Sequence, residues 1–92
     1  MDIKYLKKMF DIIKYKLIFM KTLDLHGIKH DEVAKLVDQF IWENMKSKSQ
    51  EVEIITGISD QMKMIVSETI NDYQFSIEEE YNNPGKLIIK LT

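Results

Sequence analysis

Residues 23–27 read Leu-Asp-Leu-His-Gly, an alternation of apolar and polar side chains that ends on a glycine. Neighbouring side chains of a strand point to opposite faces, so Asp24 and His26 share one face and the two leucines share the other. We therefore predict a strand over 22–26, which Gly27 ends. Ligands of open α/β sheets bind at the carboxyl ends of strands, so this polar pair marks a candidate site.

Asp24 and His26 are a combination of residue types that can carry out proton transfer. A carboxylate beside an imidazole can fix the tautomer of the ring and stabilise its charged form, which prepares the ring for proton transfer near neutral pH. His26 is therefore a candidate general acid/base, with Asp24 as its orienting partner. The spacing alone also fits a solvated strand end with a turn glycine, which is the commoner case, so other motifs must decide between the two.

Helical and extended patterns alternate after Gly27. Apolar residues spaced by three and four positions predict two helices, and the segments between and after them predict three further strands. The expected elements are a helix over 31–46, a strand over 51–56, a helix over 60–73, a strand over 75–81, a turn over 82–85 and a strand over 86–91. Their inward residues are expected to be Val33, Leu36, Val37, Phe40 and Ile41 in the first helix, and Met62, Ile65, Val66, Thr69, Ile70 and Tyr73 in the second. Ser59 is the expected N-cap of the second helix.

This order of elements predicts the fold class. Strands that alternate with helices pair in parallel through right-handed crossovers, whereas the last two strands, joined by a short turn, form an antiparallel hairpin. We expect an α/β two-layer sandwich of β-α-β-α-β-β order with a four-stranded mixed sheet. One face of that sheet is either open or partly covered by the segment that precedes the domain.

That preceding segment, residues 1–20, has its own pattern. Its apolar residues are spaced by three and four positions and form one stripe, composed of Ile3, Leu6, Phe10, Ile13, Leu17 and Met20. We therefore predict an amphipathic helix over 1–20, followed by a domain over 21–92. The stripe is expected to pack on the domain, on a second copy of the chain in a homodimer, or on a protein partner. Its basic face leaves contact with a membrane surface or a nucleic acid open.

Composition restricts location and partners. The chain has no cysteine, which excludes disulfides and fits a reducing compartment. It has no apolar run long enough to span a membrane and no cleavable signal pattern, so we expect a cytoplasmic location. Six lysines and two aspartates fall within 1–21, whereas seven lysines and thirteen acidic residues follow. All basic residues are lysines, and an acidic body without arginine is a poor sequence-independent binder of nucleic acid.

Four segments together resemble the Smr (small MutS-related) domain family. The pentapeptide 23–27 matches the opening LDLHG motif, and the helix that begins near Asp31 resembles the first helix of the family. Ile54-Ile55-Thr56-Gly57 is similar to the start of a second motif, T-G-x-G. Asn82-Asn83-Pro84-Gly85 occupies the place of a glycine-rich turn before the last strand. The resemblance covers 22–92, and the order of the motifs makes it more specific than any single motif.

The resemblance implies a nucleic-acid-processing domain. Members of the family are associated with nicking DNA and with endonucleolytic cleavage of RNA. Carried over by position, Asp24 and His26 match the functional pair of the family. The implied phosphate-binding residues are Gly27, Thr56, Gly57, Ser59, Lys63, Asn83 and Gly85. A glycine bend that leads into a helix amino terminus presents N–H groups to an anion, which makes this role physically sensible.

The second motif departs from the family pattern. Ile58 replaces the usual basic residue, Ser59 replaces the second glycine, and the loop is short and lacks the histidine often found there. These changes weaken a phosphate cradle. Asn82 and Asn83 replace glycines in the last turn, where asparagine tolerates left-handed backbone well.

Two functions follow from this pattern. The first is a metal-independent endonuclease acting on RNA or DNA without a cofactor, with His26 as general acid/base and Asp24 as its partner. The second is a non-catalytic adaptor that binds a nucleic acid or a protein. Among other residues, His30 is expected at the surface near a helix start, without shared metal ligation. Trp42 is expected at the rim of the core or on a partner.

Overall fold

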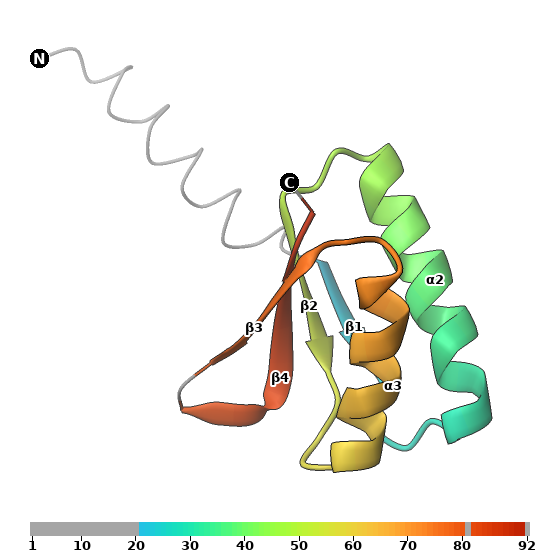
Figure 1. The fold of residues 1–92 in the computed structure, drawn as a ribbon, viewed down its shortest axis with the longest axis vertical. Helices are drawn as coiled ribbons and strands as arrows, with labels where there is room; N and C mark the ends of the chain where they lie inside the picture. The colour runs from blue at the N-terminus through green and yellow to red at the C-terminus, as the bar shows by residue number, and fades with distance from the viewer. Residues whose placement is uncertain (1–20, 81, 92) are drawn as a thin grey trace, which may run out of the picture.

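The computed structural model describes residues 21–80 and 82–91. The helix predicted over 1–20 lies outside these residues. The described elements are β1 (Lys21–Asp24), α2 (His30–Lys46), β2 (Glu51–Ile55), α3 (Asp60–Asn71), β3 (Ser76–Glu80) and β4 (Asn83–Lys90). Their order, visible in Figure 1, confirms the predicted β-α-β-α-β-β arrangement.

The four strands form one mixed sheet in the order β1-β2-β4-β3. β1 and β2 are parallel, and β4 is antiparallel to both of its neighbours. The predicted hairpin of the last two strands is therefore confirmed. The position of β4 between β2 and β3 is a finding that the sequence did not predict.

Both helices lie on one face of the sheet (Figure 1). The crossover from β1 to β2 and the crossover from β2 to β3 step in the same direction along the strand order. Right-handed crossovers that step in one direction place their helices on the same side, so the described domain has two layers. None of the helices in the described part of the chain is long and apolar enough to cross a bilayer.

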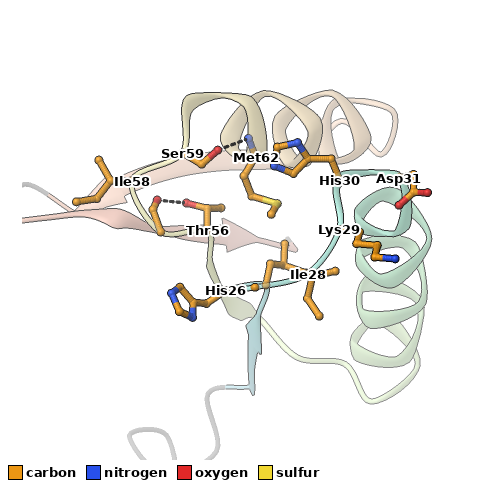
Figure 2. A pocket seen from close by; sticks show the side chains of 12 residues that line it. His26, Ile28, Lys29, His30, Asp31, Thr56, Ile58, Ser59 and Met62 are labelled. Carbon is orange, nitrogen blue, oxygen red and sulfur yellow. Dashed lines mark hydrogen bonds between the residues drawn. The ribbon is translucent and has the colours of Figure 1, made fainter.

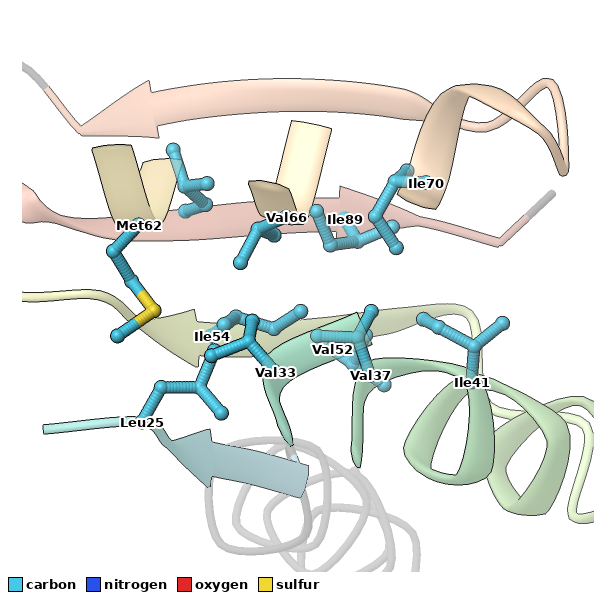
Figure 3. Close-up of a cluster of buried hydrophobic side chains, with 11 residues drawn as sticks. Leu25, Val33, Val37, Ile41, Val52, Ile54, Met62, Val66, Ile70 and Ile89 are labelled. Atoms are coloured by element: carbon cyan, nitrogen blue, oxygen red, sulfur yellow. The ribbon is translucent and has the colours of Figure 1, made fainter. Parts of the chain in front are cut away.

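The core lies between these two layers (Figure 3). Each helix contributes the predicted apolar stripe, and each of β2 and β4 contributes alternate residues. The fully or almost fully buried apolar residues are Leu25, Val33, Val37, Ile41, Val52, Ile54, Met62, Val66, Ile70, Leu87 and Ile89. The predicted inward residues Leu36, Phe40, Ile65 and Tyr73 pack against this cluster and are partly buried.

The outer surface of the helices differs from expectation. Trp42 is 58% exposed and carries the Lys46 ammonium 4.7 Å from its ring centroid, so it does not belong to the core rim. Asn44 is buried instead, because its amide group donates to the Phe40 carbonyl at 2.8 Å and its side-chain oxygen accepts from the Ser49 hydroxyl at 3.0 Å. A polar side chain satisfied in this way can occupy a core position.

Candidate functional site

Two connections meet at one edge of the sheet. β1 and β2 are parallel, so both end at the same edge, and each is followed by a turn and by the amino terminus of a helix. Each turn contains a glycine in the left-handed region, Gly27 at φ 79° and Gly57 at φ 69°. Glycine adopts this region without the clash that a Cβ would cause. The first connection (residues 25–29) and the second connection (residues 56–59) therefore lie side by side.

An open groove of about 750 Å³ lies between the two connections (Figure 2). Residues 25–31 line one side of it, residues 56–59 line the other, and Met62 from α3 contributes to its apolar part. The groove thus joins the LDLHG segment with the T-G-I-S segment. These are the two motifs that the sequence nominated.

The first connection leaves its imidazole exposed. The Asp24 carboxylate accepts a hydrogen bond from the backbone N–H of His26 at 2.9 Å, and the N–H of Ile28 donates to the Leu25 carbonyl at 3.0 Å. Within residues 21–80 and 82–91, no hydrogen bond joins that carboxylate to the His26 ring. Asp24 therefore fixes the turn that carries His26, and the ring itself stands at the surface of the groove.

Hydrogen bonds to one carbonyl fix the second connection. The Gly85 carbonyl accepts from the backbone N–H of Thr56 at 2.8 Å and of Gly57 at 3.1 Å. The buried Thr56 hydroxyl donates to the Gly57 carbonyl at 2.8 Å. A Cβ on Gly85 would lie 3.3 Å from the Gly57 Cα where β4 approaches this bend, so a larger residue there would require one of the two backbone segments to shift by a few tenths of an ångström.

Strand β4 makes this approach possible. It begins at Asn83, inside the segment predicted as a turn, and its pairing with β3 is irregular between Glu79 and Glu80. The pairing passes from Glu79 with Leu87 to Glu80 with Asn83, so β4 has extra residues at this irregularity, as in a β-bulge. The Asn83 side chain accepts from the N–H of Gly85 at 3.3 Å.

The two helices begin differently. Ser59 caps α3 as predicted, because its hydroxyl oxygen accepts from the Met62 N–H at 3.2 Å. Lys29 occupies the N-cap position of α2 and makes no side-chain cap hydrogen bond. A helix leaves its first N–H groups without intrahelical acceptors, so the uncapped start of α2 is the better donor site for an anion.

The structure brings together five of the nine residues that the sequence nominated. The groove is lined by His26, Gly27, Thr56, Gly57 and Ser59, but not by Asp24, Lys63, Asn83 or Gly85. The Lys63 ammonium lies 3.8 Å from a Glu79 carboxylate oxygen, away from the groove. Lys29 and His30 also line the groove, a position that the sequence pattern did not predict. The spacing of four positions between His26 and His30 suggested that the two residues are neighbours. Because a loop separates them, the sequence alone did not predict that both line one groove.

A metal-binding cluster does not occur among the residues that the structure describes, where no group of three or more His, Asp or Glu side chains could hold an ion. The charged and titratable side chains that line the groove are His26, Lys29, His30 and Asp31. These side chains can exchange protons and stabilise charge.

Comparison with known proteins agrees with the motifs. The family model described as the Smr domain matches residues 23–80, which include both connections, both helices and β3. No curated protein and no solved structure matches the chain.

Proposed function

This chain belongs to the Smr domain family, and from that premise we propose that it binds a nucleic-acid backbone in the groove and cleaves it with His26. The family is associated with nuclease activity and nucleic-acid binding. One observation carries the proposal. The exposed His26 ring stands on a groove that also receives two glycine bends and the uncapped start of α2.

The groove offers what a phosphodiester needs. Backbone N–H groups at a helix start bind anionic oxygens, and the positive end of the helix dipole favours negative charge. The Lys29 side chain adds a positive charge at the same rim. Imidazole is the side chain most often used as a general acid or base, so His26 can accept a proton from the substrate and return it in the same reaction cycle.

The chemistry differs between the two substrates. In RNA, His26 removes the proton of the 2′-hydroxyl, and the 2′-oxygen attacks the adjacent phosphorus. In DNA, the same imidazole would activate a water molecule. Asp24 acts as a positioning residue in both cases, because it holds the backbone of the turn from which His26 projects.

A cleavage assay tests this proposal. The full chain is incubated with labelled single-stranded RNA and with supercoiled circular DNA, each with and without a chelator. We expect cleavage that survives the chelator and falls by about 10²–10⁴-fold in His26→Ala. Lys35→Ala, at an exposed α2 position outside the groove, is the matched control. An inactive wild-type chain, or equal activity in His26→Ala, would contradict catalysis by His26.

A non-catalytic adaptor remains the second candidate, and a separate observation favours it. Trp42 and Met45 on α2 are 58% and 46% exposed, and exposed aromatic residues are typical of protein interfaces. If the wild-type chain binds nucleic acid or a protein without cleaving either substrate, and Trp42→Ala weakens protein binding, the adaptor function is supported.

A further inference from the structure

We propose that His30 is a second catalytic residue, the general acid that protonates the leaving oxygen during RNA cleavage; this inference rests on the proposed function. His30 is the first residue of α2, and its ring lines the same groove as the ring of His26 (Figure 2). Both side chains are exposed on this groove.

The other polar side chains of the groove are poorly suited to this role. The Thr56 hydroxyl is buried and donates to the Gly57 carbonyl, and the Ser59 hydroxyl oxygen caps α3. Imidazole is the side chain that most often acts as a general acid or base in catalysis. His26 and His30 are the two imidazole side chains among the residues that line the groove.

The second connection strengthens this assignment. Residues 56–59 contain no titratable side chain, so a proton donor must come from the opposite side of the groove. Ile58, at 80% exposed, stands where the family pattern has a basic residue. Within the groove, His30 supplies the acid/base group that the second connection lacks.

The proposed step balances its protons and bonds. His26 takes the proton of the 2′-hydroxyl as the bond between the 2′-oxygen and phosphorus forms. The bond between phosphorus and the 5′-oxygen breaks, and the His30 imidazolium gives its proton to that oxygen. The products are a 2′,3′-cyclic phosphate and a 5′-hydroxyl. Proton exchange with water then returns both rings to their starting states.

An RNA with sulfur in place of the bridging 5′-oxygen at one position tests the proposal. A thiolate leaves without protonation, so this substrate does not need a general acid. His30→Ala is expected to cleave ordinary RNA about 100-fold more slowly and to regain near wild-type cleavage of the sulfur substrate. His26→Ala is expected to stay slow on both substrates, and Lys35→Ala serves as the control.

The outcomes separate the two claims. If the wild-type chain cleaves neither RNA, the proposed function fails and the inference fails with it. If the wild-type chain cleaves RNA and His30→Ala is equally active, or is slow on both substrates, only the role of His30 is overturned. The dependence of the RNA cleavage rate on pH, measured for wild type and His30→Ala, gives a second readout. The charged or titratable side chains near His30 that can also affect this dependence are Asp24, His26, Lys29 and Asp31. Loss of the alkaline limb in His30→Ala supports the assignment, and an unchanged profile contradicts it.

Discussion

The two connections differ in how they use their polar groups, although each follows a parallel strand and contains a left-handed glycine. In the second connection, Thr56 and Gly57 are bonded to the carbonyl of Gly85, and Ser59 caps α3. Next to the first connection, the Asp24 carboxylate accepts a hydrogen bond from the backbone N–H of His26, and the side chains of His26 and of His30, the first residue of α2, are exposed. The hydrogen bonds of the second connection thus stabilise the shape of the groove, whereas the first connection and the start of α2 supply the exposed imidazoles.

Among the substitutions considered, we expect Gly85→Ala to reduce the stability of the folded chain most. Gly85→Ala places a Cβ 3.3 Å from the Gly57 Cα, against backbone that cannot move aside easily. We expect the free energy of unfolding to fall by about 1–3 kcal/mol in a urea titration. Asn82→Ala, at the exposed position just before β4, is the control and should change this free energy by less than about 0.5 kcal/mol. Wild-type stability in Gly85→Ala would show that β4 does not hold the second connection.

A smaller loss is expected when the second connection loses its buried hydroxyl. Thr56→Val keeps the shape of the side chain and removes the hydrogen bonds that the hydroxyl donates to the Gly57 carbonyl at 2.8 Å and to the Gly85 carbonyl at 3.3 Å. The expected loss is about 0.5–1.5 kcal/mol in the same titration. An unchanged midpoint would mean that the hydroxyl does not stabilise the bend.

A substitution next to the first connection should reduce cleavage activity more than it reduces folding stability. Asp24→Ala removes one exposed hydrogen bond to the His26 N–H, which should cost roughly 0.5 kcal/mol of folding free energy. Because the turn positions His26, cleavage should fall by roughly 10-fold or more. Asp24→Asn keeps an acceptor oxygen and should restore much of the activity. Equal inactivity of the two variants would show that the negative charge matters, and would contradict a role through the backbone.

The smallest expected effect lies away from both connections. Burial, and next the hydrogen bond that the Tyr73 hydroxyl donates to Asp38 at 3.1 Å, raise the pKa of Tyr73 above its ordinary value. The folded chain therefore holds this proton more tightly than the unfolded chain, so stability should fall as the pH rises through about 10. Unfolding midpoints at about pH 9 and about pH 11 should differ more in wild type than in Tyr73→Phe. Equal differences would contradict this contribution.

Local patterns predicted most of the fold. The helical stripes, the alternating strands and the Ser59 cap depend on neighbours in sequence, and the structure confirms them. The insertion of β4 between β2 and β3 depends on pairing between distant segments, which periodicity does not contain. The exposure of Trp42 and the burial of Asn44 depend on hydrogen bonds and packing around the end of α2.

The candidate site was predicted where topology alone brings residues together. The carboxyl ends of parallel strands meet at one edge of a sheet, so the LDLHG and T-G-I-S segments were expected at the same edge, and the pairing of β1 with β2 makes them neighbours. The side chain of Lys63 was wrongly predicted at the groove, because strand topology does not decide where a residue within α3 points. Its ammonium pairs with the Glu79 carboxylate on β3. His30 was missed because the path of the first connection decides whether it faces the groove.

A heteronuclear NMR titration with a single-stranded oligonucleotide that lacks 2′-hydroxyls tests the central claim most directly. The account predicts chemical-shift changes at the backbone amides of Gly27, His30, Gly57 and Ile58, with smaller changes elsewhere. Changes confined to the outer surface of α2 or to the sheet face opposite the helices, with these four amides unmoved, would contradict it.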